Sequence, residues 1–282
     1  MWWNLLVILP LAVILWLFYE WMEHALVQYV STVVECQKLP ADTELRLCLV
    51  SDLHNNKKDF KKLTAHIKDF APEMILLAGD LVNKHKTDNV FAEQFLDEIS
   101  TLDVPVFYSA GNHELSLMEE KPYAWKEFME KLPKGIIYLE NESVLCKFNS
   151  KEICVTGLSL TKIFYKKGKL YDNKAELPRI NNPGNQFRIM IAHHPEYASF
   201  YSQYQADFIV SGHLHGGLLR LPFFGGMVSP RFRIPNGYDA GVVDLNDGSK
   251  MFVSRGLGSH TIPLRFFNRV EVNFLVLKGT KE

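Results

Sequence analysis

The order of apolar and polar positions after residue 44 predicts a regular alternation of strands and helices. Three short apolar runs end abruptly in polar residues or glycine, at residues 45–50, 74–78 and 104–109. Two segments between them carry apolar side chains at helical spacing, at residues 58–70 and 88–102. Asp88 is placed to cap the second of these helices. Two strand–helix–strand units in succession predict a parallel sheet with right-handed crossovers.

The second half of the chain has the pattern of further short strands. A hairpin is expected over residues 144–148 and 151–156. Buried strands that end in histidine are expected at residues 188–192 and 208–211. Closing strands are expected at residues 241–245, 251–254 and 270–277. The sequence contains no internal repeat and no low-complexity segment, so one folded domain over residues 44–282 is the simplest division.

The chain opens with a long uncharged apolar run. From Trp2 to Tyr19 only Asn4 is strongly polar, and as a helix this run would cover roughly 27 Å, close to the ~30 Å thickness of a bilayer's hydrocarbon core. Aromatic residues gather near its two ends, where rings prefer the membrane interface: Trp2, Trp3, Trp16, Tyr19 and Trp21. The basic n-region and small-residue cleavage site of a signal peptide are not evident. We therefore expect residues 1–20 to be a transmembrane anchor; a buried core helix is the alternative, which Pro10 mildly favours.

Residues 21–43 mix polar and apolar positions, and we expect a juxtamembrane helix and linker there. Neither flank of the apolar run carries a basic cluster, and Lys38 is the first Lys or Arg of the chain. The positive-inside rule therefore gives no orientation. The cysteine content modestly favours the cytoplasmic side for the folded domain.

Four cysteines, Cys36, Cys48, Cys146 and Cys154, form no CxxC pair and lie mostly in apolar runs. This pattern favours buried free thiols in a reducing compartment over a disulfide framework. Cys146 and Cys154 flank a turn at Asn149-Ser150. A three-residue loop would place the two thiols opposite each other, and a loop of even length would point them to opposite faces.

Composition and charge narrow the class of protein. Of the 282 residues, 47% are hydrophobic and 22% are charged, which is typical of a globular protein rather than a disordered one. The formal net charge is -1, so there is no electrostatic case for a nucleic-acid partner.

Metal-ligating side chains follow five of the expected strands. The motifs are Asp52-Leu53-His54, Gly79-Asp80, Gly111-Asn112-His113-Glu114, His193-His194-Pro195 and Gly212-His213-Leu214-His215. Because the carboxyl ends of parallel strands meet at one edge of a sheet, these groups are expected to converge. One Asp-x-His is explained by a surface turn, but five motifs at successive strand ends are much harder to explain by chance.

The ligand types in these motifs fit a pair of divalent metal ions. Carboxylate, imidazole and amide oxygen together suit Mn, Fe, Zn or Co. Two metals about 3.5–4 Å apart need a ligand that touches both, and a carboxylate can do so. Asp80 is the natural bridge, because it ends the central strand and lies between the other groups in sequence.

The order D-x-H, G-D, G-N-H-E, H and G-H-x-H resembles the calcineurin-like metallophosphoesterase superfamily, over nearly everything after residue 45. The resemblance implies an α/β sandwich in which helices flank two central mixed sheets. The anchor and the segments at residues 221–225, 254–258 and 263–265 resemble the superfamily's membrane-associated bacterial branch. That branch includes proteins similar to UDP-2,3-diacylglucosamine hydrolases and broad-specificity phosphodiesterases.

Carried over residue by residue, the resemblance implies two metal-binding sets. One is Asp52, His54, Asp80 and His215, and the other is Asp80, Asn112, His193 and His213. His113 would bind no metal but would protonate the leaving oxygen or stabilise charge on phosphorus. A water shared by the metals would be the in-line nucleophile. Glu114 is expected to support its loop, and the spacing to Pro195 favours His193 over His194 as the ligand.

Several features bear on the substrate and leave alternatives open. Leu214 and Leu218 replace the Thr and Gln that are common in related sequences, which bears on the pocket wall. Arginines in the C-terminal third can bind a phosphate or lie on a solvated surface: Arg220, Arg231, Arg233, Arg255, Arg265 and Arg269. Residues 162–171 suit an anionic membrane, an acylated substrate or an ordinary surface loop. For Phe223 and Phe224 we favour core packing over an acyl pocket. We assign no function to His24, His66, His85 or His260.

The expected activity is hydrolysis of a phosphodiester or diphosphate bond in a membrane-associated or lipid-linked nucleotide. A broad-specificity phosphomonoesterase or a cyclic-nucleotide phosphodiesterase is the alternative, because the same metals serve either reaction. A catalytically silent metal-binding scaffold is disfavoured, since every expected position is filled. A nuclease is disfavoured by the neutral charge and the lack of a basic, aromatic-rich groove. No pattern singles out substrate-binding residues.

Overall fold

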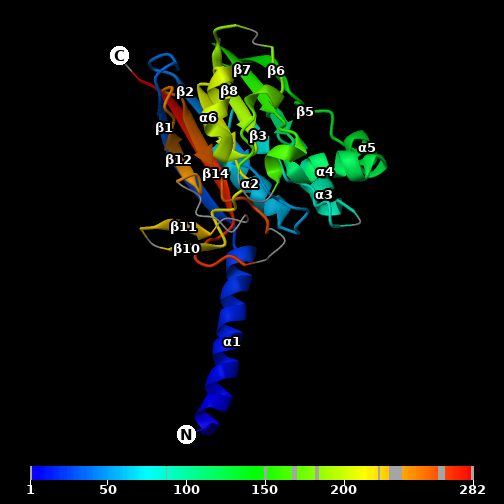
Figure 1. Cartoon of the computed structure of the whole chain (residues 1–282), viewed down its shortest axis with the longest axis vertical. Helices are drawn as coiled ribbons and strands as arrows, with labels where there is room; N and C mark the ends of the chain where they lie inside the picture. The colour runs from blue at the N-terminus through cyan, green and yellow to red at the C-terminus, as the bar shows by residue number, and fades with distance from the viewer. Residues whose placement is uncertain are drawn as a thin grey trace.

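The computed structural model describes residues 2–86, 88–148, 151–166, 170–181, 184–221, 223–228, 237–259 and 264–280. Two six-stranded mixed sheets stack against each other, with helices outside them and one long helix projecting away (Figure 1). This arrangement confirms the expected α/β fold with two mixed sheets flanked by helices.

The first sheet combines the N-terminal half of the chain with its last strand. In spatial order its strands are β1 (Gln28–Cys36), β14 (Glu271–Gly279), β2 (Glu44–Val50), β3 (Met74–Ala78), β4 (Val106–Ser109) and β5 (Ile136–Tyr138). Strands β2 to β5 are parallel, and β14 is antiparallel to β2. The expected parallel unit is therefore present, extended by β5 on one side and by β14 and β1 on the other.

The second sheet comes from the second half of the chain. Its order is β12 (Gly241–Asp244), β13 (Lys250–Val253), β9 (Phe208–Ser211), β8 (Phe187–Ala192), β7 (Lys151–Leu158) and β6 (Glu142–Phe148). Its four inner strands are parallel, and the two outer pairs are antiparallel hairpins. A separate hairpin joins β10 (Leu219–Leu221) to β11 (Gly225–Val228).

The longer helices are α1 (Trp2–Ala25), α2 (Phe60–Phe70), α3 (Val90–Ser100), α4 (Asn112–Glu120) and α5 (Pro122–Glu130). The short helical turns are η1 (Lys162–Tyr165), η2 (Lys174–Glu176), η3 (Pro195–Tyr197), α6 (Ala198–Tyr201) and η4 (Ser202–Tyr204). The side chain of Asp59 accepts a hydrogen bond from the Lys62 amide at 3.0 Å and caps α2.

The residue before α3 is Asn89, one position after the expected cap Asp88, although the Asp88 side chain accepts a hydrogen bond from the Val90 amide at 3.4 Å. The next two amides of the first turn, of Phe91 and Ala92, donate to the Asn55 side chain, at 2.8 and 3.0 Å. Asn55 lies just after the first metal motif in the sequence, so the start of α3 and that motif are held together.

The core lies in layers that follow from the continuously apolar strands. Between the sheets, Leu47 and Leu76 of the first sheet pack in one cluster with Ile189 and Val210 of the second. On the outer face of the first sheet, alternate residues of the same strands pack against α2 and α3. Strands that are buried on both faces read as unbroken apolar runs, as the sequence showed.

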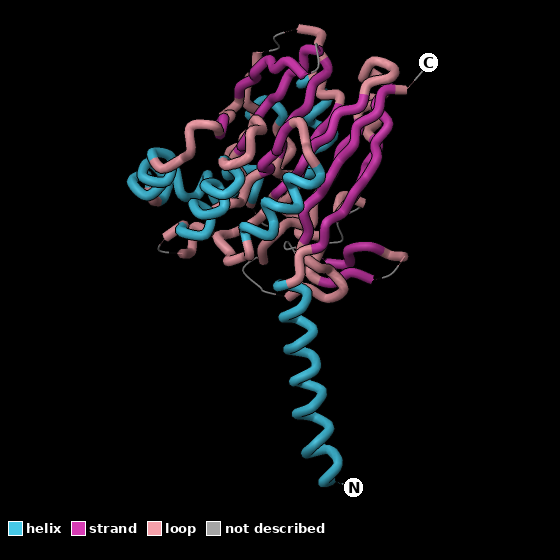
Figure 2. The backbone as a smooth tube through the Cα atoms, turned by 180° about the vertical axis from the view of Figure 1, so that it is seen from behind, coloured by secondary structure: helices cyan, strands magenta, loops and turns pink. Residues whose placement is uncertain are grey.

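The N-terminal helix α1 stands clear of the domain (Figures 1 and 2). Side chains from Ile8 to Phe18 are exposed, and the stretch Ile8–Ala25 is long and apolar enough to cross a membrane. The alternative that this run is a buried core helix is therefore wrong for the exposed part of α1. By length and composition α1 is a candidate membrane span.

The expected linker over residues 21–43 differs from the structure. Helix α1 continues to Ala25, and Gln28–Cys36 forms the edge strand β1, parallel to β14. Its alternating pattern buries Val34 and Cys36 in the core between the sheets. The linker expectation is wrong for these residues, because one apolar face suffices to bind an edge strand to a sheet.

The hairpin of β6 and β7 decides the geometry of Cys146 and Cys154. Cys146 pairs with Ile153, and Leu145 pairs with Cys154, so the two thiols point to opposite faces. All four cysteines are free, and three of them are buried. The turn residues 149 and 150 lie outside the described residues.

Candidate metal centre

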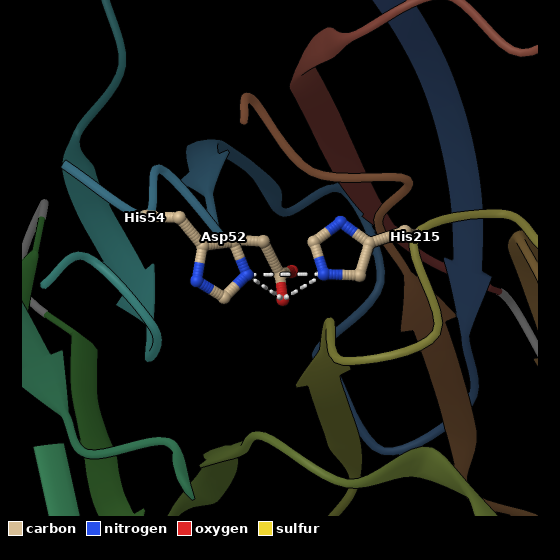
Figure 3. Close-up of side chains that lie close together, drawn as sticks. All are labelled: Asp52, His54 and His215. Carbon is tan, nitrogen blue, oxygen red and sulfur yellow. Dashed lines mark hydrogen bonds and ion pairs between the residues drawn. The ribbon is translucent and has the colours of Figure 1, made fainter. Parts of the chain in front are cut away.

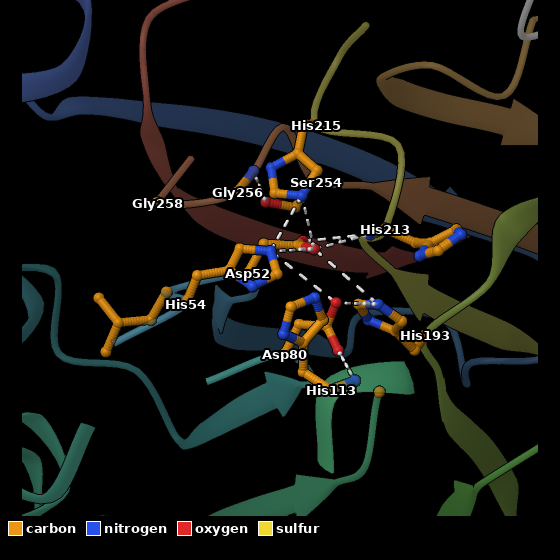
Figure 4. Close-up of polar contacts among 12 residues, drawn as sticks. Asp52, His54, Asp80, His113, His193, His213, His215, Ser254, Gly256 and Gly258 are labelled. Carbon is orange, nitrogen blue, oxygen red and sulfur yellow. Dashed lines mark hydrogen bonds and ion pairs between the residues drawn. The ribbon is translucent and has the colours of Figure 1, made fainter. Parts of the chain in front are cut away.

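The loops that follow five strands bring the predicted ligands to one place, where the carboxyl ends of both sheets meet (Figure 4). Asp52 and His54 follow β2, Asp80 follows β3, Asn112 and His113 begin α4, His193 follows β8, and His213 and His215 follow β9. The side chains therefore come from both sheets rather than from the edge of one.

Five of these residues have left-handed backbone conformations. Their φ angles are 53° at Asp52, 50° at His54, 52° at Asp80, 71° at His213 and 52° at His215. Such angles are uncommon for residues other than glycine and cost about 1–3 kcal/mol each. Backbone bonds hold the turns: the Asp52 amide donates to Gly79 O at 2.9 Å, and the His54 amide donates to Asp80 O at 2.8 Å.

Glycines allow the loops to approach this closely. A Cβ at Gly111 would lie 2.4 Å from Asp80 Oδ1, and a Cβ at Gly212 would lie 2.2 Å from Asp52 Oδ2. Neither distance is possible for real atoms. The two motif glycines therefore make room for the two carboxylates.

Asp52, His54 and His215 form one group able to hold a metal ion (Figure 3). His54 Nε2 lies 3.1 Å from His215 Nε2, and His215 Nε2 lies 3.4 Å from Asp52 Oδ1. All three residues are buried. Their donor atoms face a common point, as ligands of a single ion do.

Asp80, His193 and His213 form a second such group. His193 Nε2 lies 3.2 Å from Asp80 Oδ2, and its Nδ1 lies 2.6 Å from the carbonyl oxygen of Ala78. Because Nδ1 donates to that carbonyl, Nε2 faces the carboxylate, where it carries a proton without metal and would offer its lone pair to an ion. A hydrogen bond from the second ring nitrogen to a carbonyl is the contact that usually orients a metal-binding imidazole.

Asp80 lies between the two groups. Its Oδ2 is 3.8 Å from His54 Nε2 in the first group and 3.2 Å from His193 Nε2 in the second. The amide of His113 donates to its Oδ1 at 2.7 Å, which fixes the carboxylate. The carboxylate of Asp80 therefore lies within reach of both groups.

Asn112 offers an amide oxygen at the first position of α4. Its Oδ1 is buried and has no hydrogen-bond partner among the residues that the structure describes. A buried polar atom without a partner is costly. The donor set thus fits a metal ion, which would satisfy this oxygen.

Burial and neighbouring charges shift the pKa values of the group. Burial raises the pKa of Asp52 to about 6, although the nearby His193 opposes the shift. Burial also acts to raise the pKa of Asp80, but the imidazoles of His193 and His113 hold it well below its usual range. Burial opposes charge on His193, yet Asp80 and Asp52 raise its pKa to about 10. Without metal, the centre therefore holds protons that an ion would have to displace.

His113 differs from the other histidines in its contacts. Its Nδ1 accepts a hydrogen bond from the Lys84 amide at 3.3 Å, and its ring packs edge-on against His54 at 4.5 Å. With Nδ1 accepting, the neutral ring carries its proton on Nε2. His113 also lies near His54 and Asp80 in a third group of close donor atoms, but this tautomer presents Nε2 as a proton donor.

Glu114 supports the loops, as expected. Its carboxylate accepts hydrogen bonds from the amides of Asp80 and Gly111, both at 2.8 Å, and of Val82 at 3.1 Å. One fully buried side chain thus ties the loop after β3 to the start of α4.

The structure separates His193 from His194. The His194 ring lies among aromatic rings, with centroids 4.8 Å from Tyr197 and 4.3 Å from His213. It belongs to none of the metal-capable groups among the described residues. Of the two histidines, it is His193 that lies with Asp80 and His213 in the second metal-capable group.

Two supporting residues were not identified from the sequence. Arg265 was considered for a phosphate contact, but it is buried, and its NH2 donates to His215 Nδ1 at 3.2 Å and Gly258 O at 2.5 Å. Asn268 Nδ2 donates to the carbonyl oxygens of His215 and Gly217, at 2.6 Å each. Both lie about 50 residues after the motif that they hold, and although Arg265 ends the segment 263–265, no local pattern indicated a contact of either residue with His215.

Three further arginines that were considered for a phosphate contact are paired with carboxylates: Arg220 with Asp239, Arg255 with Glu271, and Arg269 with Glu23. Lys162 of the segment 162–171 pairs with Glu119 and Glu120, both on α4. Arg231, Arg233, His260 and residues 167–169 lie outside the described residues.

The apolar residues near the last motif divide into buried and exposed ones. Leu214 and Leu218 are buried. The core packing expected for Phe223 and Phe224 is wrong, because they are 105% and 77% exposed at the tip of the β10–β11 hairpin. A two-stranded ribbon at the edge of the domain has no second layer to cover its tip.

Comparison with known proteins gives a family match over the same motifs. The model for calcineurin-like phosphoesterases matches residues 45–217. The uncharacterized protein YpbG of Bacillus subtilis is 23% identical over 243 residues, covering 86% of this chain and 84% of that protein. The phosphodiesterase YaeI of Escherichia coli is 28% identical over 208 residues, covering 73% and 70%. A transmembrane protein with a metallophosphoesterase domain from Danio rerio is 22% identical over 260 residues, covering 88% and 57%.

Proposed function

Since the chain belongs to the calcineurin-like phosphoesterase family and is a metal-dependent phosphoester hydrolase, we propose that it cleaves a phosphodiester or diphosphate bond at a dinuclear metal centre. Asp52, His54, Asp80 and His215 would hold one ion. Asp80, Asn112, His193 and His213 would hold the other. The observation that carries this proposal is Asp80, whose Oδ2 lies within 3.8 Å of an imidazole nitrogen of each group.

The bound ions, which we expect to be Mn, Fe, Zn or Co, would supply charge for the phosphoryl oxygens and lower the pKa of a water between them. The chain itself would fix the geometry. Glu114 anchors both loops that carry Asp80 and Asn112, and Asn268 holds the loop of His215. Ligands placed on strained but well-anchored turns need little reorganisation when substrate binds.

His113 would act as the proton donor to the leaving oxygen. The Lys84 amide holds its Nδ1 as an acceptor, so Nε2 carries the proton in the neutral ring. The side chain is 4% exposed and packs against His54, which keeps it beside the metal ligands. General acid catalysis of this kind contributes roughly 100- to 10,000-fold in rate.

For the substrate, we propose a phosphodiester or diphosphate in a membrane-associated or lipid-linked nucleotide. The apolar helix α1 supports a single-pass anchor, which would raise the local concentration of an enzyme and a lipid-linked substrate. Relatives named as a phosphodiesterase and as a transmembrane protein agree with this choice. The cysteine content favours a cytoplasmic domain. The division into an anchor over residues 1–20 and a catalytic domain after residue 44 stays a prediction. Strand β1, which precedes residue 44, pairs with β14 and so adds to the folded domain.

The proposal is tested by hydrolysis assays on the full chain in detergent micelles. The substrates are bis-p-nitrophenyl phosphate and p-nitrophenyl phosphate, after chelation and after Mn is added back. We expect Mn-dependent cleavage of the diester. Asp80→Asn should abolish it, and His113→Gln should lower kcat roughly 100- to 10,000-fold while metal binding persists. His85→Ala is the matched control, since His85 is exposed and its ring lies 5.9 Å from that of His113.

The other outcomes discriminate between functions. Cleavage of the monoester alone would favour a phosphomonoesterase. Bound metal without turnover of either ester or of a lipid-linked nucleotide would favour a silent scaffold. Activity that survives chelation would contradict the metal mechanism.

A further inference from the structure

Exposed aromatic side chains gather where α1 joins the domain. We call this set the aromatic rim, and it consists of Phe18, Trp21, Phe223, Phe224 and Phe267, which are 55%, 59%, 105%, 77% and 54% exposed. Single exposed apolar residues are common, but several exposed large rings on elements that lie at one end of the domain mark an interaction surface.

Three segments that are distant in the sequence form the rim. The Tyr19 ring of α1 lies 5.6 Å from that of Phe266 and 5.9 Å from that of Phe267. The carbonyl oxygen of Phe266 in turn accepts a hydrogen bond from the amide of Arg220 in β10, at 2.9 Å. Helix α1, the loop that carries Phe266 and Phe267, and the β10–β11 hairpin are thus joined by direct contacts.

The hairpin has an orientation that suits a membrane surface. Figures 1 and 2, which view the molecule from opposite sides, both show β10 and β11 at the level where α1 leaves the domain. In both views the hairpin runs across the helix axis rather than along it. A bilayer crossed by α1 along its normal would therefore have its surface parallel to the hairpin.

Hydrogen bonds of buried residues hold the joint between α1 and the domain. Glu20 Oε2 accepts from the Arg265 amide at 3.1 Å, and Glu23 Oε2 accepts from the Asn268 amide at 2.7 Å. Both glutamates are buried, and the Val270 amide donates to the carbonyl of Glu23 at 3.1 Å. Because these bonds fix the last turns of the helix, the domain has one orientation relative to the helix axis.

We propose that the aromatic rim inserts into the lipid interface beside α1, so that the catalytic domain lies flat against the bilayer. The occupant is lipid because the rim includes Phe18, the last residue of the exposed apolar stretch of α1 that begins at Ile8 and belongs to the candidate membrane span. Aromatic rings prefer the interface between headgroups and acyl chains. The inference rests on the membrane anchoring proposed for α1.

The docked hairpin would also set the position of the metal centre. Leu219 begins β10 four residues after His215, and Arg220 donates to the carbonyl of Gly216 at 3.2 Å. Arg265 contacts Glu20 of the helix through its amide and His215 through its guanidinium. A single residue therefore connects the helix end to a predicted ligand, and the centre is held at a fixed place relative to the lipid surface.

Photocrosslinking of the full chain in phosphatidylcholine–phosphatidylglycerol vesicles tests the proposal. The photoreactive p-benzoylphenylalanine replaces one residue at a time, at Phe223, Phe224, Trp16 or Tyr123. Tyr123 on α5 is 88% exposed and is the matched control for an exposed aromatic ring elsewhere on the domain. We expect lipid adducts at positions 223 and 224 on the order of tenfold above those at 123.

Trp16 reports on the anchor alone. Adducts at 16 without adducts at 223 and 224 would overturn the rim proposal and leave the anchor intact. The absence of lipid adducts at position 16 would overturn the proposal that α1 is a membrane anchor, and the rim proposal with it. Adducts at 223 and 224 to a second copy of the chain in place of lipid would also overturn it. Hydrolysis of bis-p-nitrophenyl phosphate by the same variants shows independently whether the phosphoesterase proposal stands.

Discussion

At the scale of single residues, the metal centre is a set of buried groups that compete for protons and for metal. Without a metal, imidazole and carboxylate compensate each other's charge: Asp80 and Asp52 raise the pKa of His193, and His193 opposes the rise that burial causes in the pKa of Asp52. A metal ion would replace that compensation with direct bonds and release the proton of His193. Metal affinity is therefore linked to pH.

The pH dependence follows from the direction of these shifts. Between about pH 6 and pH 10, His193 of the metal-free protein is protonated, so Mn affinity should rise about tenfold per pH unit. Below about pH 6 Asp52 is also protonated, so Mn affinity falls more steeply as the pH is lowered. Titration calorimetry at pH 6.5 and 7.5 measures this. Affinity that is independent of pH would contradict it, and His85→Ala should follow the wild-type curve.

The sequence singled out the proposed ligand residues, which the structure brings together, because each stands in a short motif directly after an apolar run. Residues that hold the ligands in place were harder to identify. Glu114 belongs to such a motif and was assigned its supporting role. Arg265 and Asn268 reach His215 from a distant segment, through contacts that only the tertiary fold brings about.

At the scale of elements, the loops after β3 and β4 depend on one buried carboxylate. Glu114→Ala would leave three buried amides without an acceptor, and we expect it to lower the free energy of unfolding by roughly 3–5 kcal/mol. Glu114→Gln keeps one oxygen and should cost less. Urea unfolding in detergent measures both.

Glu119→Ala is the control for this prediction. Glu119 is also on α4, but its side chain is 59% exposed and pairs with Lys162. Such exposed pairs contribute roughly 0–1 kcal/mol. Equal losses for the Glu114 and Glu119 variants would refute the supporting role of Glu114.

Elements with a complete apolar pattern were predicted well from the sequence. Strands β3 and β9 have the expected bounds, and α2 begins two residues after the expected position. Strand β1 was missed because only one of its faces is apolar and its partner β14 lies some 240 residues away. A pattern that is half polar reads as a linker until its partner strand is known.

At the scale of the whole molecule, the end of α1 and strand β1 belong to the folded domain, although the rest of α1 stands clear of it. A chain that begins at Phe18 keeps Glu20, Glu23 and β1. A chain that begins at Thr43 loses all three, which exposes the edge of β14 and leaves the Arg265 and Asn268 amides without their acceptors.

We therefore expect the two shortened chains to differ in stability. The chain from Phe18 should fold and retain diesterase activity, and the chain from Thr43 should unfold at lower urea or aggregate. Size-exclusion chromatography and urea unfolding compare them. Equal stability would show that β1 and the end of α1 are dispensable for the fold.

The central claim, two metal ions bridged by Asp80, is tested most directly by counting and observing the ions. The full chain is loaded with Mn, and elemental analysis is combined with electron paramagnetic resonance. We expect two Mn per chain with the spectrum of a spin-coupled pair, and at most one uncoupled Mn in Asp80→Asn. One uncoupled ion in the wild-type chain, or none, would contradict the dinuclear centre.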